Sequence, residues 1–251
     1  MELADRGHAA MADRYSLGAE LDGGEAVRTD DGVLYAWRSD FPVMMNAAVP
    51  LHGDPDALLS AARDFFAERR RGFSFFARTD AEDQAAAAAG MECVLERYPA
   101  MVRREPFELR VVDGIDMRRV VDHASARDYA NLADAAFQAI GLPPGLLAEL
   151  RPEALIRDDT AAFVAYEADR PLACASVTVA REVGGIQWVA VVEDARGRGL
   201  ADACTRAASN AGFELGADCA WLEASHMGEP VYLRMGFEEL FSYRIYVAPR
   251  P

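Results

Sequence analysis

The chain has 251 residues, of which 51% are hydrophobic and 27% charged, and its formal net charge at pH 7 is −15. This composition excludes a disordered or collagen-like chain. The acidic balance disfavours nucleic acid and anionic membranes as partners, because both attract basic surfaces. All 26 basic side chains are arginine, so chemistry that needs a lysine amine, such as Schiff-base formation, is excluded.

Two α/β units are predicted, at residues 1–105 and 106–251, with the boundary between Glu105 and Pro106. In the first unit, Asp54 before Pro55 marks a helix start, because aspartate caps a helix and proline fits its first turn. The arginines that end this helix are expected to compensate its dipole. The elements expected in this unit are a helix at 3–21, strands at 33–38 and 43–49, a helix from 55 to the arginines 69–71, a strand at 73–78, a helix at 80–91, and a hairpin of strands 93–97 and 100–104.

The second unit is expected to open with a strand at 107–112. Apolar residues at helical spacing predict helices at 125–140 and 200–216. The other elements expected are a short helix near 146–150, strands at 160–167, 172–181, 185–193 and 219–225, a short helix at 230–235, and a last strand at 241–247. Strands that alternate with helices in this way predict a mixed α/β fold.

The four cysteines, at 93, 174, 204 and 219, include no C-x-x-C pair. This spacing gives no metal or redox motif and predicts reduced thiols in the core. The N-terminus is acidic and lacks the apolar stretch of a signal peptide, and no apolar run approaches the length of a membrane span. We therefore expect a cytoplasmic protein without a metal.

The most informative segment is a valine-rich strand that leads into a glycine-rich turn and then a helix. Val191 and Val192 end the strand, and Gly197 and Gly199 lie in the turn. Glycine lets the backbone approach an anion closely, and the N–H groups at a helix start attract negative charge. The pattern predicts a site for a diphosphate, with an ordinary strand–turn–helix corner as the alternative. A dinucleotide fingerprint is excluded, because its third glycine would fall at Asp202.

Two motifs resemble those of the GNAT superfamily of acyl-CoA-dependent N-acetyltransferases. Arg196-x-x-Gly199-x-Ala201 is similar to the family motif (Q/R)xxGx(G/A), and the segment YLRMGF that starts at Tyr232 is similar to its Y-x-x-x-G-F segment. The resemblance covers residues 107–247. It implies an α/β fold with a GNAT-type mixed central sheet flanked by helices, preceded by a smaller α/β lobe that resembles half a GNAT domain.

The resemblance also implies a place for each part of acetyl-CoA. Pantetheine would pair with Val191 and Val192 like an added strand, and a backbone N–H near Val191 would polarise the thioester carbonyl. The hydroxyl of Tyr232 would protonate the departing thiolate, with a purely structural core tyrosine as the alternative. The diphosphate would be bound by the backbone of Arg196, Gly197, Arg198, Gly199, Leu200 and Ala201.

The general base that takes a proton from the acceptor amine is left open. Glu223 is the first choice, because it faces the predicted thioester gap from the neighbouring strand. Glu182 and Glu193 are rivals, and His226 follows the same strand and could relay a proton. For each carboxylate, a solvated surface position is the alternative.

The first unit lacks the features of a phosphate site at its equivalent corner. Residues 50–55 contain neither an arginine nor a pair of glycines, and Asp54 caps the helix where a phosphate would need free N–H groups. We therefore expect a degenerate lobe that binds no CoA. It would wall the substrate site, complete a sheet or form a dimer surface, and the sequence leaves these open.

The resemblance therefore implies an N-acetyltransferase. It would transfer acetyl from acetyl-CoA to an amine of a small molecule or peptide by direct attack in a ternary complex. The acidic surface favours a cationic acceptor. The alternative is a non-catalytic acyl-CoA-binding sensor module. Neither nucleic acid nor membrane is expected as a partner, and a homodimer stays open.

Overall fold

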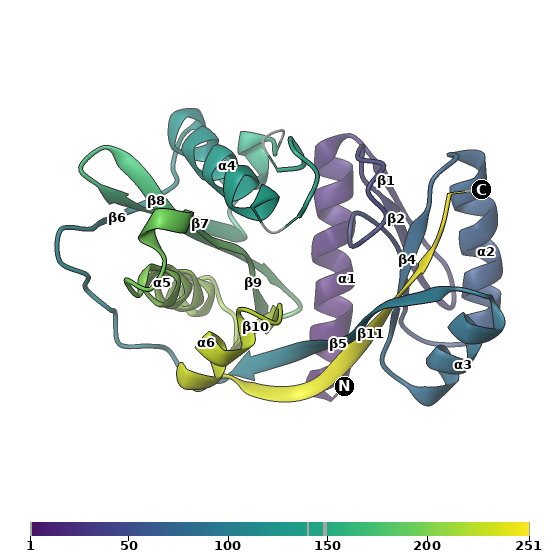
Figure 1. Ribbon diagram of the computed structural model, residues 1–251. Coiled ribbons are helices and arrows are strands. Elements are labelled where there is room, and N and C mark those ends of the chain that lie inside the picture. The colour runs from purple at the N-terminus through teal and green to yellow at the C-terminus, as the bar shows by residue number, and fades with distance from the viewer. Residues whose placement is uncertain (1, 140, 148–149, 251) are drawn as a thin grey trace. The chain divides into compact units, whose positions relative to one another are not determined.

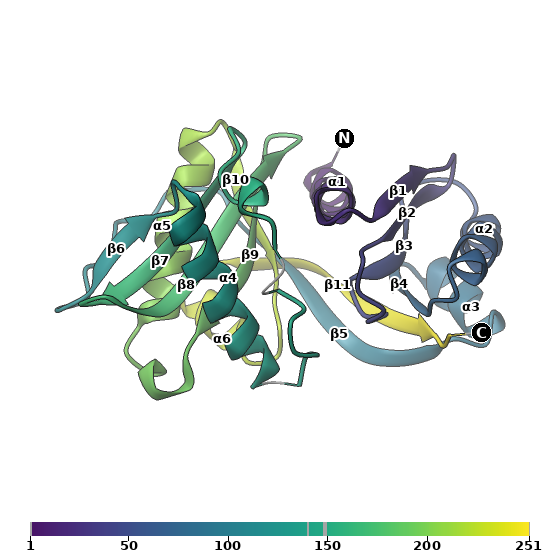
Figure 2. The same ribbon diagram turned by 90° about the horizontal axis from the view of Figure 1, so that it is seen from above.

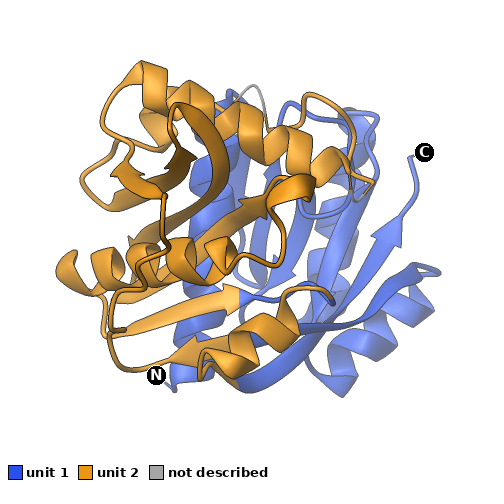
Figure 3. Ribbon diagram, turned by 60° about the vertical axis from the view of Figure 1, so that its left-hand side comes forward, with its two compact units in different colours: residues 1–100, 223–226, 239–251 blue, residues 101–222, 227–238 orange. Residues whose placement is uncertain are grey.

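The computed structural model describes residues 2–139, 141–147 and 150–250. The chain forms two compact units (Figure 3). Unit 1 comprises residues 1–100, 223–226 and 239–251, and unit 2 comprises residues 101–222 and 227–238. Three strands have residues in both units: β5 (Glu92–Arg103), β10 (Cys219–Glu223) and β11 (Glu238–Ala248).

Unit 1 is an α/β unit whose strands follow the order β1-β2-β3-β4-β11-β5 (Figure 1). The β3–β4 pair is parallel, whereas β1–β2, β2–β3 and β4–β11 are antiparallel. Its other elements are α1 (Leu3–Asp22), β1 (Glu25–Arg28), β2 (Gly32–Ala36), β3 (Asn46–Pro50), α2 (Pro55–Glu68), β4 (Phe73–Ala77) and α3 (Asp80–Ala88).

Helices cover both faces of the sheet in unit 1, with α1 on one side and α2 and α3 on the other (Figure 2). Side chains of successive residues in β2 point to opposite faces of the sheet, as they do in any strand. Tyr35 stacks on Tyr15 of α1, with 5.8 Å between the ring centroids. Leu34 instead belongs to the core cluster that contains Leu58 and Phe66 of α2. All three of these apolar side chains are almost fully buried.

Unit 2 has the strand order β5-β10-β9-β8-β7-β6, in which only the β9–β10 pairing is parallel among β6 to β10. Its other elements are β6 (Asp116–Arg119), α4 (His123–Gln138), the 3₁₀ turn η1 (Pro152–Ala154), β7 (Thr160–Glu167), β8 (Arg170–Ala180), β9 (Val183–Val191), the 3₁₀ turn η2 (Glu193–Ala195), α5 (Leu200–Glu214) and α6 (Glu229–Arg234).

Helices α4 and α5 pack on opposite faces of the sheet in unit 2 (Figure 1). Neighbouring residues of β8 show this directly. Ser176 accepts a hydrogen bond from Tyr129 of α4 at 2.9 Å. Val177 lies against Gly212 of α5, where a Cβ would fall 3.0 Å from the valine Cγ2. Glycine at position 212 therefore lets α5 lie close to the sheet.

The predicted α/β class and most of the predicted elements are confirmed, but the hairpin expected at 93–104 is wrong. Residues 92–103 form one continuous strand, β5, through Tyr98 and Pro99. Proline has no backbone N–H to donate to a neighbouring strand, so the strand around Pro99 needs other hydrogen bonds. The Tyr98 N–H donates to Ser242 Oγ at 3.0 Å, and the Pro99 carbonyl accepts from the Ala224 N–H at 2.9 Å. The short strands β1 and β6 were not predicted.

The strand expected at 107–112 is also wrong, because the backbone of this segment bonds to side chains of α5. Asn210 donates to the Phe107 carbonyl at 2.8 Å and accepts from the Phe107 N–H at 2.7 Å. Arg206 donates to the Glu108 carbonyl at 3.1 Å. These side chains satisfy backbone groups that a strand would pair with another strand.

The compact units also differ from the predicted boundary at 105/106. Residues 239–251 are far along the chain but belong to unit 1. The reason is strand pairing, since β11 runs antiparallel to β4 with Arg244 opposite Ala77 and Ala248 opposite Phe73. Ile140, the predicted end of a helix, and positions 148 and 149 of the predicted helix near 146–150 lie outside the described residues.

We expect Asn210→Ala to lower the free energy of unfolding by about 1–3 kcal/mol, because it leaves the half-buried N–H and carbonyl of Phe107 without partners. Urea denaturation measures the change. Asn131→Ala on the exposed face of α4 is the matched control, since it makes the same substitution within a helix. Equal effects of the two variants would contradict this role of Asn210.

Candidate active site

The start of α5 is uncapped, and the turn before it contains two glycines. Gly197 and Gly199 have φ values of 79° and 81°, which a residue with a side chain adopts only under strain. Gly199 is the N-cap residue and offers no side chain to the first turn. The first N–H groups of a helix have no acceptor within it, and no side chain caps them here, so they are donors that an external acceptor can use. We call residues 196–201 the cradle.

The arginines around the cradle differ in what they contact. Arg198 forms an ion pair with Glu167, and Arg170 forms one with Asp194, with N–O distances of 2.6 Å and 2.7 Å. Arg196 is exposed and makes no ion pair with any described residue. Arg196, the arginine of the predicted motif, therefore differs from Arg198 and Arg170 in having no carboxylate partner among the described residues.

A further arginine at the cradle was missed by sequence reasoning. Arg110 donates to Asp202 of α5 at 2.5 Å, and its guanidinium lies against the Cα of Gly199. The two partners are 92 positions apart in the chain. Nothing in the local pattern around Arg110 signals this contact, because the segment was expected to be a strand.

Strands β9 and β10 pair over a short stretch and then separate. The parallel register runs from Val183 opposite Cys219 to Gly185 opposite Trp221 and does not continue in the described strands. At the far end of β9, the Val192 N–H is bonded to the Leu172 carbonyl of β8 at 2.9 Å. Because successive N–H groups of a strand point in opposite directions, the N–H of Val191 points away from β8, to the side where β10 has diverged.

An irregularity in β9 lies where the strands separate. Trp188 has a φ of 53°, and the β8–β9 register shifts between Cys174 and Ser176. A bulge of this kind bends a strand. The buried hydroxyl of Tyr129 donates to Ser176 Oγ, and the Trp188 carbonyl lies 3.4 Å from it. Tyr129 of α4, which sequence reasoning also missed, thus supports the bend.

Tyr232 of α6 has a buried ring that meets Phe237 edge to face, with 5.8 Å between the centroids. Its hydroxyl makes no hydrogen bond to any described residue, and it is not among the fully enclosed polar atoms. Burial raises the pKa of Tyr232 above its ordinary value. The phenol therefore stays protonated across the neutral range, which is the form that a proton donor requires.

Glu223, at the end of β10, is in a buried ion pair within unit 1. Arg14 of α1 lies 3.1 Å from its Oε2, and the two side chains are 1% and 3% exposed. Nε and Nη1 of Arg14 are buried and have no hydrogen-bond partner among the described residues. The charge of this carboxylate is thus compensated inside the protein. The sequence showed no sign of the pair, whose members are 209 positions apart.

The rival bases lie in three different places. Glu182 is an exposed turn residue with a φ of 61° between β8 and β9. Glu193 begins the 3₁₀ turn η2 just before the cradle. His226 is exposed and belongs to unit 1. Of these, only Glu193 is adjacent in sequence to the end of β9.

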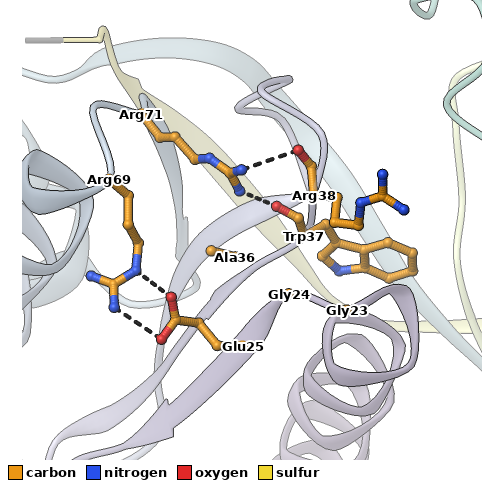
Figure 4. A pocket seen from close by; sticks show the side chains of 8 residues that line it. All are labelled: Gly23, Gly24, Glu25, Ala36, Trp37, Arg38, Arg69 and Arg71. Atoms are coloured by element: carbon orange, nitrogen blue, oxygen red, sulfur yellow. Dashed lines mark hydrogen bonds and ion pairs between the residues drawn. The ribbon is translucent and has the colours of Figure 1, made fainter.

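A pocket of about 320 Å³ in unit 1 contains three arginines, and the guanidinium groups of two of them bind neighbouring residues (Figure 4). Arg69 binds Glu25 through hydrogen bonds of 2.5 Å and 2.9 Å and donates to the Phe65 carbonyl in the last turn of α2. Arg71 donates to the carbonyls of Trp37 and Arg38. The contact of Arg69 with the Phe65 carbonyl agrees with the predicted compensation of the helix end, whereas Arg71 donates to carbonyls outside α2. The lining residues are Gly23, Gly24, Glu25, Ala36, Trp37, Arg38, Arg69 and Arg71.

Other kinds of site find no support in the described part of the chain. No group of three or more metal-ligating side chains occurs there, and no described helix is long and apolar enough to cross a membrane. All four cysteines are free, and three are buried. Burial raises the pKa of the Cys174 thiol well above its usual range, which disfavours a thiolate nucleophile.

Comparisons with known proteins agree with this geometry. The sequence profile of the family described as "Acetyltransferase (GNAT) domain" matches residues 158–239, which include β7 to β10, the cradle and Tyr232. A search of curated proteins finds no match.

Solved structures match along nearly the whole chain. A GCN5-related N-acetyltransferase from Kribbella flavida is 21% identical with a TM-score of 0.77, over 99% of this chain and 96% of that one. Another from Sphaerobacter thermophilus is 16% identical with a TM-score of 0.65, over 99% and 94%. A tandem GNAT protein from the clavulanic acid biosynthesis pathway is 15% identical with a TM-score of 0.62, over 99% and 96%. At these identities the likeness concerns the fold.

We expect Arg14→Met to lower the free energy of unfolding by about 3–5 kcal/mol, because it leaves the buried Glu223 carboxylate without its cation. Urea denaturation at pH 7 measures the loss. The double variant Arg14→Met with Glu223→Gln removes both charges and should regain part of the stability. A single variant as stable as the parent would show that the pair is not closed in solution.

Proposed function

Residues 158–239 are a GNAT acetyltransferase domain, and from this premise we propose that the chain transfers an acetyl group from acetyl-CoA to an amine of a small molecule or peptide. The observation that carries the proposal is the uncapped start of α5 behind Gly197 and Gly199. Such a turn presents unpaired N–H groups and a favourable dipole to a diphosphate. The 3₁₀ turn η2 joins it to β9, whose Val191 N–H points away from β8.

The residues of unit 2 fit the parts of acetyl-CoA. The N–H groups of the cradle would bind the diphosphate, and the exposed guanidinium of Arg196 would add a positive charge. The backbone of Val191 would pair with a pantetheine amide, because its N–H points away from β8. Val192 would contribute its carbonyl or side chain only, since its N–H is bonded to Leu172.

The transfer that we propose is a direct attack without an acyl-enzyme. The acceptor nitrogen bonds to the thioester carbonyl carbon as the carbon–sulfur bond breaks. A backbone N–H near Val191 donates to the carbonyl oxygen as it becomes negative. Tyr232 gives its hydroxyl proton to the departing sulfur and regains one from water, while the proton of the amine passes to a base. Because the buried cysteines offer no thiolate, they have no part in the reaction.

Glu223 is the base that we propose, acting through water. Its carboxylate is too deeply buried to touch a large acceptor, and Arg14 compensates its charge. An ionised carboxylate can accept a proton from a water that has taken it from the amine. A cationic acceptor would be in keeping with the net charge of −15.

We expect Gly199→Glu to weaken acetyl-CoA binding at least 100-fold, because the new carboxylate repels the diphosphate and the positive φ strains any side chain. Calorimetric titration of the parent should give one site per chain. Gly114→Glu is the control, since Gly114 also has a positive φ of 75°, has open space around it and lies in unit 2. Binding by Gly199→Glu at the strength of the parent would contradict the cradle.

We expect Tyr232→Phe to lower kcat about 10²- to 10⁴-fold while acetyl-CoA affinity stays unchanged, because only the proton donor is lost. Thiol release from acetyl-CoA with a panel of primary amines measures turnover, and Tyr246→Phe in unit 1 is the control. Unchanged turnover in Tyr232→Phe would remove Tyr232 from the mechanism. If the parent binds acetyl-CoA but turns over no amine, the non-catalytic binding module is favoured instead.

A further inference from the structure

We infer that Arg110, which lies outside the GNAT domain at 158–239, is a cosubstrate-binding residue that contacts the diphosphate of CoA. The inference rests on the proposed function, because it concerns the same cradle. It adds a second chain segment to the site, contributed from residues 107–110. The contacts that carry it all lie within unit 2.

The segment before Arg110 is fixed along α5 by side chains that recur every four residues of that helix. Asn210 binds both backbone groups of Phe107, and Arg206 donates to the Glu108 carbonyl. Asp202, in the first turn, accepts from Arg110. Residues four apart lie on one face of a helix, so these three side chains form one row that ends at the cradle.

The guanidinium of Arg110 lies directly over the N-cap glycine. A Cβ on Gly199 would fall 2.6 Å from Nη2, 2.8 Å from Cζ and 3.1 Å from Nε of Arg110. The guanidinium thus occupies the space that a side chain at position 199 would fill. Only a glycine leaves room for it, which gives Gly199 a second function besides its backbone conformation.

Arg110 has hydrogen-bonding capacity left for a phosphate. Its Nη1 donates to Asp202, whereas its Nε and Nη2 have no partner among the described residues. The side chain is 47% exposed, so a ligand can reach it. A guanidinium offers several donors in a planar fork that matches phosphate oxygens. Arg110 can therefore keep its bond to Asp202 and donate to a diphosphate at the same time.

The negative charge of Asp202 in the first turn of α5 needs a cation such as Arg110 beside it if an anion is to bind there. Asp202 would repel a diphosphate bound at the start of α5, where the dipole favours an anion. Asp202 is bonded on one oxygen to Arg110 and on the other to Arg206. With two guanidinium groups on one carboxylate, this turn has a net positive charge. Asp202, which occupies the place of the third glycine of a dinucleotide motif, thus orients Arg110.

The test is calorimetric titration of the full chain with acetyl-CoA, comparing the parent with Arg110→Ala. We expect the dissociation constant to rise about 10- to 100-fold, the range of a charged hydrogen bond. Arg110→Lys, which keeps the charge and loses the fork, should lie between the two. Arg104→Ala is the matched control, because Arg104 is a similarly exposed arginine of unit 2 paired with Glu238.

Two further measurements make the result specific. Unfolding temperatures of the ligand-free variants should match the parent, since Leu109 and Val111 beside Arg110 are already exposed and little burial is lost. The loss in Arg110→Ala should be the same with 3′-dephospho-CoA as with CoA. A loss that disappears with 3′-dephospho-CoA would overturn the diphosphate contact in favour of the 3′-phosphate.

The failure of this inference differs from the failure of the proposed function. If the parent binds acetyl-CoA and Arg110→Ala binds it equally well, Arg110 has no part in the site and the acetyltransferase proposal stands. If the parent binds no acetyl-CoA, both are overturned.

Discussion

The unpaired N–H groups at the start of α5 are the constraint on which the rest of the site depends. A helix start that no side chain caps must find acceptors in water or in a ligand. Gly199 leaves these donors open, in contrast to the start of α2 in unit 1, where Asp54 accepts from the Asp56 N–H at 2.9 Å. Two corners of similar chain order thus differ in whether a side chain caps the helix start, and the uncapped start is the one where we propose that an anion binds.

The pairing of charges at the start of α5 explains how a protein with a negative net charge can have a region that favours an anion. The net charge of −15 describes the whole surface, whereas binding depends on the few groups within a Debye length. At the first turn of α5, the single carboxylate of Asp202 is bonded to Arg110 and Arg206. The local balance is therefore opposite in sign to that of the chain.

Buried and half-buried polar groups join distant parts of the chain within each unit. In unit 1, Arg14 from the N-terminal helix is paired with Glu223 more than two hundred residues later. In unit 2, Tyr129 supports the bulge at Trp188, and Asn210 binds the backbone of Phe107. Buried polar groups are costly when unpaired, so each such contact specifies one arrangement of the segments that it joins.

The sequence by itself determined the α/β class, most element positions and the glycine turn before α5, because caps, glycine turns and apolar periodicity act within a few residues. It also determined the candidate role of Tyr232 through a local motif. Only the tertiary structure decided that β5 continues through Pro99, that residues 107–110 lie along α5, and that Glu223 is paired with Arg14. Each of these depends on a partner far away in the chain. Which distant donor meets which acceptor is set by packing, and no local pattern encodes it.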